Sequence, residues 1–264
     1  MTKIIKHLIL IIIFKEIRVS NYKMKQYTYI SIDLNGSIGE QLFQIAEIYI
    51  FKKVSKIKRK VLIKKDDNKY LNTIFKNVFK TYSSDKYDEI KFISVNDNDN
   101  GMDNIKLLNY NRIFDNDIKE IITNIVYKNE DLMYAAYFKY RDIIEYFGKN
   151  TKDEDLVAID YNSNYNKDFY VKALEIFNKE KLVIFGDLTN EYENIFSKDK
   201  YKIYCVKNID KETEFILYSM FKYNLISDSL NLLWSSYISH YENKKIVVHN
   251  NLKNISNQFV THYL

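Results

Sequence analysis

Two glycines near the start of the chain stand where a phosphate could bind. Gly36 and Gly39 are three residues apart, after a strand-like segment at 27–34 and before an apolar helical pattern that begins at Glu40. A glycine turn there brings bare backbone N–H groups and a helix N-terminus together, which is a common way to hold a phosphate. The alternative is a tight strand-to-helix turn without a ligand, and a lone pair of glycines at this spacing favours that alternative.

Polar residues follow two later apolar segments. Asp187 ends EKLVIFGD, and Ser227, Asp228 and Ser229 follow YNLI ahead of another helical pattern. Asp187 is placed either to contact the ribose or base of a nucleotide or to cap the next helix. The three residues 227–229 either present hydroxyl and N–H groups to a phosphate or form an N-cap cluster. Both alternatives stay open at both places.

Alternating strands and helices must position these residues. Segment 27–34, the helix from Glu40 and segment 60–65 form a strand–helix–strand unit, which favours a parallel sheet. A second series of apolar segments predicts four more strands, at 155–161, 180–187, 200–206 and 223–229. We therefore expect an α/β fold of two Rossmann-like halves facing a cleft, with ligands beyond the carboxyl ends of the strands.

The remaining segments give weaker signals. Between the two series, 94–104 is a predicted surface loop, and 72–82 and 115–127 show weak helical patterns. We divide the chain into an N-terminal extension at 1–23, an α/β half at 24–150 and a Rossmann-like nucleotide-sugar half at 151–264. The apolar run in the extension is shorter than the roughly 20 residues of a membrane span, so it predicts either a weak signal anchor or an amphipathic extension.

Composition excludes several classes of protein. Hydrophobic residues make up 46% of the 264, which is enough for a core, and 40 basic against 35 acidic residues give only a mild charge of +5. The basic run 52–65 has no interleaved aromatic ring, so it favours a solvated helix end and strand over a nucleic-acid surface. The single cysteine, Cys205, excludes an intrachain disulfide and is predicted to be a small buried hydrophobe. The four histidines lack metal-ligand spacing, and we expect no metal.

Four segments in the same order resemble one enzyme family. GSIGEQLFQIA resembles the GGLGNQLFQxA signature of the α-1,2-fucosyltransferases, which are inverting, GDP-fucose-dependent glycosyltransferases, and further resemblances lie at 134–147, 168–187 and 217–238. The resemblance implies a glycosyltransferase B fold without a bound metal, in which fucose passes from GDP to a sugar hydroxyl with inversion. It implies donor-binding roles for a set of residues that also includes Gln41: Gly36, Gly39, Gln41, Asp187, Ser227, Asp228 and Ser229.

The chain departs from the family at polar positions that face the donor. Without a metal, the leaving diphosphate must be stabilised by backbone dipoles and basic side chains. The resemblance places Asp160 where the family has a histidine and Asn162 where it has its phosphate-binding arginine, and these two are the candidates for catalysis. Glu40 replaces an asparagine and puts a carboxylate beside the expected phosphate. The candidate replacements for the missing cation are Arg141, Lys139 and Lys167.

The sequence thus predicts a glycosyltransferase that moves fucose or another sugar from a nucleotide sugar to a glycan hydroxyl, without a further cofactor. One alternative is an inactive relative that binds sugar or a protein partner. Another, with less support, is an unrelated α/β nucleic-acid binder that uses the basic run. Asn35, Gly36 and Ser37 form a glycosylation sequon inside the expected donor turn, where a glycan would block the site. We therefore expect a cytoplasmic protein, or a membrane-associated one if residues 1–23 contact a membrane.

Overall fold

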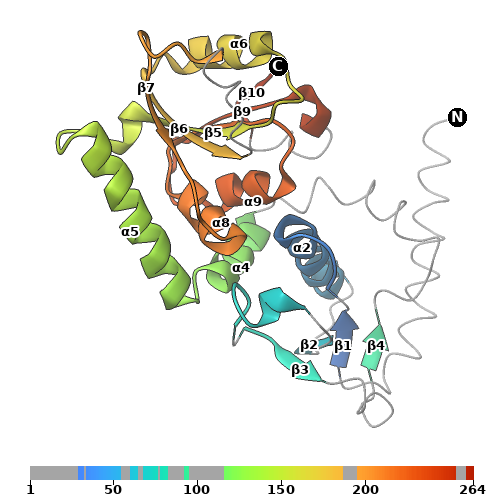
Figure 1. Ribbon diagram of the computed structural model, residues 1–264. Coiled ribbons are helices and arrows are strands. Elements are labelled where there is room, and N and C mark those ends of the chain that lie inside the picture. The colour runs from blue at the N-terminus through green and yellow to red at the C-terminus, as the bar shows by residue number, and fades with distance from the viewer. Residues whose placement is uncertain are drawn as a thin grey trace, which may run out of the picture.

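Two parallel β-sheets organise the part of the chain that the structure describes. The computed structural model describes residues 29–32, 34–54, 60–64, 68–76, 78–82, 92–94, 116–186, 195–253 and 260–264. Helices fill the space between the sheets, and one further helix covers the outer face of the larger sheet (Figure 1). The extension 1–23, Asp187 and nearly all of the predicted loop 94–104 lie outside the described residues.

The smaller sheet, sheet A, contains the strand–helix–strand unit that the sequence predicts. Its strand order is β3-β2-β1-β4, and every pairing is parallel. Helix α2 joins β1 to β2, as predicted, and begins two residues earlier than expected. The bounds are β1 Tyr29–Ile32, α2 Ile38–Val54, β2 Lys60–Lys64, β3 Lys80–Tyr82 and β4 Phe92–Ser94.

The larger sheet, sheet B, has the strand order of a Rossmann fold. Its order is β10-β9-β8-β5-β6-β7, again with parallel pairings. The chain builds outward from β5 to β7 and then returns to β8 on the other side of β5, so the topological switch point lies between β5 and β8. The bounds are β5 Leu156–Tyr161, β6 Lys181–Gly186, β7 Lys202–Cys205, β8 Tyr223–Ile226, β9 Lys245–Val248 and β10 His262–Tyr263. The first four of these strands confirm the prediction, whereas β9 and β10 were not predicted.

Most helices in the described residues begin at a polar N-cap. The side chains of Asn129, Asn166, Asp210 and Ser229 each accept a hydrogen bond from a backbone N–H in the first turn of the helix that follows. The α-helices after α2 are α4 Asn116–Val126, α5 Glu130–Phe147, α6 Lys167–Phe177, α8 Lys211–Ser219 and α9 Leu230–Ile238. The 3-10 helices are η1 Lys69–Leu71, η3 Asp153–Asp155 and η4 Asn250–Leu252. None of the described helices is long and apolar enough to cross a membrane.

Of the two segments with weak helical patterns, one forms a helix and the other does not. Segment 115–127 forms α4, as expected, but the helix expected at 72–82 is wrong, because η1 is followed there by turns and by strand β3. The N–H groups of Lys76 and Val78 bond to carbonyls only three residues back, so no α-helical ladder forms. Ile74 and Phe75 are buried, which explains the apolar spacing that imitates a helix.

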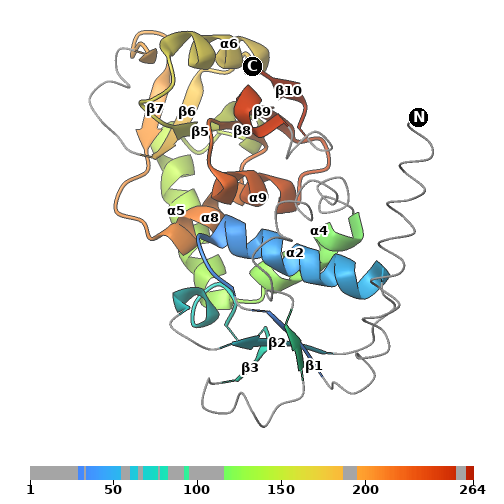
Figure 2. The same cartoon turned by 90° about the vertical axis from the view of Figure 1, so that its right-hand side faces the viewer.

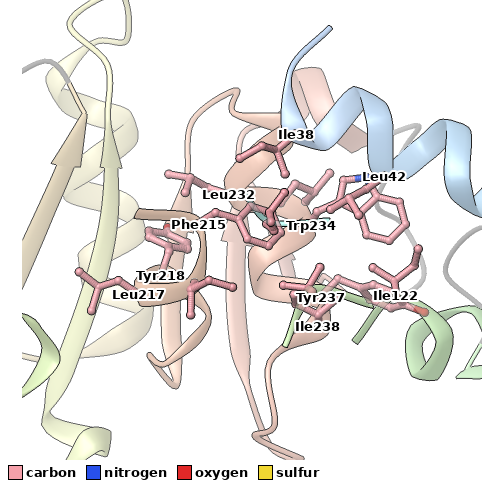
Figure 3. Packing of buried hydrophobic residues seen from close by; sticks show 14 of the residues in the cluster. Ile38, Leu42, Ile122, Phe215, Leu217, Tyr218, Leu232, Trp234, Tyr237 and Ile238 are labelled. Carbon is pink, nitrogen blue, oxygen red and sulfur yellow. The ribbon is translucent and has the colours of Figure 1, made fainter. Parts of the chain in front are cut away.

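The core lies between the two sheets, around α2 and α9. Helix α2 passes between α9 and sheet A (Figure 2), and the rings of Phe43 and Trp234 meet edge to face with their centroids 5.0 Å apart. Ile38 and Leu42 of α2 approach Trp234 and Leu232 in the same cluster (Figure 3). Ile45 and Trp234 are fully buried in this cluster. Helix α5, from the half assigned to 24–150, packs on α8 and β7.

Candidate functional site

A capping box closes the glycine turn ahead of α2. The Ser37 N–H donates to Glu40 Oε2 at 2.7 Å, and the Glu40 N–H donates to Ser37 Oγ at 3.4 Å. Gly36 has a φ of +83°, a backbone conformation that favours glycine, and a Cβ there would also displace the Glu40 carboxylate. The Glu40 carboxylate therefore already occupies one N–H group that a phosphate would need.

The amide side chains around this turn hold it in place. Gln41 is buried, and its Nε2 donates to the Gly36 carbonyl at 3.0 Å while its Oε1 accepts a bond from Asn68 Nδ2 at 2.9 Å. Asn68 also donates to the Leu34 carbonyl at 3.0 Å, and the Asn35 N–H donates to Gln44 Oε1 at 3.1 Å. Both polar atoms of the Gln41 side chain are therefore used to hold the glycine turn.

Gly39 brings the beginnings of two helices into contact. Its N–H donates to Asn231 Oδ1 at 2.6 Å, in the first turn of α9. A Cβ on Gly39 would lie 2.7 Å from the Leu230 carbonyl carbon and 2.8 Å from the Asn231 nitrogen, so any side chain would push the helices apart. Gly39 thus lets the two halves of the molecule meet. Asn231, which is 192 residues away along the chain, was not predicted from the sequence.

An internal carboxylate fills the switch point of sheet B. Asp160, at the end of β5, accepts three hydrogen bonds on Oδ2: from the Ser227 N–H at 3.1 Å, the Ser227 hydroxyl at 2.8 Å and the Ser229 N–H at 3.3 Å. Burial raises the pKa of Asp160, and the bonds from Ser227 and Ser229 act against that rise. The N–H groups expected to bind a phosphate are therefore held by a carboxylate of the chain itself.

Asn162 and Asp228 meet beside Asp160. Asn162 Nδ2 donates to both Asp228 carboxylate oxygens, at 3.1 and 3.2 Å. The Asn162 backbone is fixed by Tyr170, whose hydroxyl accepts from the Asn162 N–H at 2.8 Å and donates to its carbonyl at 3.0 Å. Ser229 is the N-cap of α9, because its Oγ accepts the Leu232 N–H at 3.2 Å. The structure thus gathers five predicted residues around the end of β5: Asp160, Asn162, Ser227, Asp228 and Ser229.

Two of the three candidate cations, Arg141 and Lys139, make their contacts away from Asp160 and Asn162. Arg141 pairs with Glu145 at 3.5 Å on the exposed side of α5, and the amine of Lys139 lies 5.8 Å from the centre of the Tyr204 ring on β7. The Arg141 pair lies within α5 and the Lys139 contact is with the outer strand of sheet B, so neither interaction involves β5 or β8. Lys167 is exposed in the first turn of α6, five residues after Asn162.

A hollow opens at the carboxyl ends of β6 and β7. Its volume is about 400 Å³, and it is lined by Gly186, Val206, Lys207, Asn208, Ile209, Lys211 and Glu214. Lys211 pairs with Glu214 at 2.7 Å. Sequence reasoning missed Lys207, which lies just after the partly buried strand β7, and Lys211, which begins α8. Cys205, expected to be buried, is half-buried and lines a second cavity on the outer side of β7.

The fold matches that of a known glycosyltransferase. A mutant of the fucosyltransferase FUT1 from Arabidopsis thaliana, solved in complex with GDP, superposes on the chain with a TM-score of 0.57 at 9% sequence identity. The match covers 84% of this chain and 70% of that one. No protein-family model matches the chain, and no curated protein sequence does. The similarity confirms the expected α/β fold of the glycosyltransferase B kind.

Proposed function

We propose that the chain is a glycosyltransferase that binds a nucleotide sugar at the carboxyl edge of sheet B. The hollow at the ends of β6 and β7 supports this most, because open Rossmann sheets bind nucleotides at that edge and the hollow presents Lys207 and Lys211. The fold shared with GDP-bound FUT1 makes a GDP-sugar, with fucose as the first candidate, the donor to test first.

In an inverting transfer, the acceptor hydroxyl attacks the anomeric carbon, the nucleoside diphosphate leaves, and a base takes the hydroxyl proton. Asp160 is the better candidate for the base, since the amide of Asn162 cannot accept a proton under these conditions. Burial raises the pKa of the Asp160 carboxyl, which makes it a stronger base than an exposed carboxylate. A glycan hydroxyl is the expected acceptor.

An inactive relative that still binds a nucleotide sugar is the second candidate. Its support is the negative charge at the switch point, where Asp160 occupies the N–H groups of Ser227 and Ser229 and Asp228 stands beside Asn162. Stabilising a leaving diphosphate needs positive potential, and losing one such donor typically costs about 10² to 10³ in rate.

A thermal-shift panel followed by a turnover assay distinguishes these candidates. The panel contains GDP, GDP-fucose, GDP-mannose and UDP-sugars, because a ligand that binds only the folded state raises the melting temperature. We expect a GDP-containing ligand to stabilise the protein, Lys207→Ala to weaken that effect at least tenfold in affinity, and Lys172→Ala on the exposed surface of α6 to leave it unchanged.

Release of GDP from a stabilising GDP-sugar in the presence of oligosaccharides then decides activity. Turnover that is lost in Asp160→Asn supports the transferase. Binding without turnover supports the inactive relative. If no nucleotide stabilises the protein, the nucleotide assignment is wrong.

A further inference from the structure

Helix α5 carries an unusual number of exposed rings. Five large hydrophobic residues among the described residues are exposed, and four of them lie on this one helix: Tyr134 (62%), Tyr137 (53%), Phe138 (59%) and Tyr146 (48%). Scattered exposed apolar residues need no explanation, but a contiguous group marks an interaction surface. Figure 1 shows α5 at the edge of the molecule.

The spacing of residues on this surface is that of a helix-pairing seam. Ala136, Ile143 and Phe147 are buried, and the helix packs through this side on α8 and β7. The opposite side carries a seam of residues separated alternately by three and four positions, as in a heptad repeat. We call these residues the α5 seam: Asp131, Tyr134, Phe138, Arg141 and Glu145.

We propose that the α5 seam binds the α5 seam of a second copy of this chain, in antiparallel orientation. A two-fold axis midway between Tyr134 and Phe138 places each of these rings opposite the other ring of the second copy. The same axis places Asp131 opposite Arg141 at both ends of the aromatic layer. The seam is therefore self-complementary in charge and in shape, as an isologous interface requires.

Other pairings lack this complementarity. A parallel pair sets Asp131 against Asp131 and Arg141 against Arg141, and like charges in contact oppose association. An antiparallel pair shifted by one heptad sets Phe138 against Arg141 and Tyr134 against Glu145. The charged ends are available for the proposed register, because Asp131 is 87% exposed with Lys76 at 3.8 Å, and Arg141 is more than half exposed beside Glu145. The proposal does not depend on the nucleotide assignment.

The expected dimer is weak. One pair of 18-residue helices covers less than the roughly 1,200–2,000 Å² of a stable interface, so we expect dissociation in the micromolar range. Sedimentation velocity of the full chain, from about 1 to a few hundred micromolar, measures the equilibrium directly. We expect the sedimentation coefficient to rise with concentration from monomer to dimer.

Substitutions identify the surface. Phe138→Asp should leave a monomer at every concentration, whereas Val171→Asp, at another exposed hydrophobic residue on α6, should not change association. Arg141→Asp should weaken the dimer at least tenfold, because it faces Asp131 of the second copy, and adding Asp131→Arg should restore it. Unchanged thermal melting verifies that each variant folds, as expected for residues this exposed.

Three results overturn the proposal. The first is a monomer at the highest concentration. The second is a dimer that survives Phe138→Asp, which places the contact elsewhere. The third is a monomer whose Tyr134 ring instead binds an oligosaccharide, detected as loss of glycan binding in Tyr134→Ala, because the surface is then a carbohydrate platform.

Discussion

The Gly39 N–H donates a 2.6 Å hydrogen bond to Asn231 Oδ1, and this bond joins the first turn of α2 to the first turn of α9. It links the helix that follows the first strand of sheet A to the helix that follows β8 in sheet B. A contact between two helix N-termini concentrates positive potential at one point. The carboxylates of Glu40 and Asp160 accept hydrogen bonds from N–H groups there and offset this positive potential.

Because the backbone of α9 lies so close to Gly39, adding a single methyl group there should destabilise the protein. Gly39→Ala should lower the free energy of unfolding by about 1–3 kcal/mol, because its Cβ would meet the backbone of Leu230 and Asn231. Asn231→Ala should cost less, about 0.5–1.5 kcal/mol, for one hydrogen bond. Urea unfolding measures both. Equal stability of Gly39→Ala and the wild type would show that the helices do not approach this closely.

The polar contacts of Asn162 predict how binding can be strengthened. The fucosyltransferases that the chain resembles have their phosphate-binding arginine at the position of Asn162, but an arginine at 162 in this chain faces the Asp228 carboxylate. We therefore expect Asn162→Arg with Asp228→Asn to bind GDP at least tenfold, about 1.4 kcal/mol, more tightly than the wild type. Asn162→Arg alone should gain less. Isothermal titration at neutral pH compares the variants, and an equal gain with and without Asp228→Asn contradicts this account.

Glu40→Asn should lower the free energy of unfolding, although the fucosyltransferases that the chain resembles have asparagine there. Its carboxylate closes the capping box with Ser37, and losing such a cap costs about 0.5–2 kcal/mol. Gln41→Ala should cost at least as much, because it removes the hydrogen bond to the Gly36 carbonyl and the one from Asn68. Urea unfolding at constant pH tests both. A Glu40→Asn variant as stable as the wild type would mean that the carboxylate does not cap α2.

Replacing Lys244 should stabilise the protein, by an amount that depends on pH. Its Nζ is buried without a hydrogen-bond partner among the described residues, and burial together with the charge of Lys119 lowers the pKa of Lys244 well below its ordinary value. Between the lowered native pKa and the ordinary pKa, the unfolded chain binds more protons, so stability rises with pH through this window. Lys244→Met should thus stabilise the protein by at least about 1 kcal/mol at neutral pH. The gain should shrink as the pH approaches the ordinary lysine pKa.

Thermal melting from pH 7 to pH 10 checks this prediction, with Lys245→Met as the matched control. Lys245 donates from Nζ to the Ile176 carbonyl at 2.6 Å, so its removal should destabilise the protein. A loss of stability in Lys244→Met would show that its amine has a partner in solution.

The sequence predicted the parts of the fold that depend on local pattern. Strands β5 and β6 are apolar runs buried on both faces, which a parallel sheet requires, and they were recognised by that property. Strand β10 has only two residues and no pattern to recognise. Segment 72–82 misled because Ile74 and Phe75 are buried by a turn that has the apolar spacing of a helix.

The candidate site was predictable only where its contacts are local. The Ser37–Glu40 capping box corresponds to the local motif Ser-x-x-Glu and could have been predicted. On the basis of the family resemblance, Glu40 was instead interpreted as a charge beside a phosphate. Asn231 and Lys207 were not predicted, because each reaches the site only through the tertiary fold. The part assigned to Asp187 stays a prediction, since this residue lies outside those that the structure describes.

Hydrogen exchange with and without saturating GDP tests the central claim most directly, because it shows where a nucleoside diphosphate binds. We predict slower exchange of backbone N–H groups at 206–214, around the hollow that Lys207 lines, and at the end of β5 near Asn162. Exchange at 138–147 in α5 should stay unchanged. Protection confined to other parts of the molecule, or no protection at saturating GDP, would contradict a nucleotide-sugar site at the carboxyl edge of sheet B.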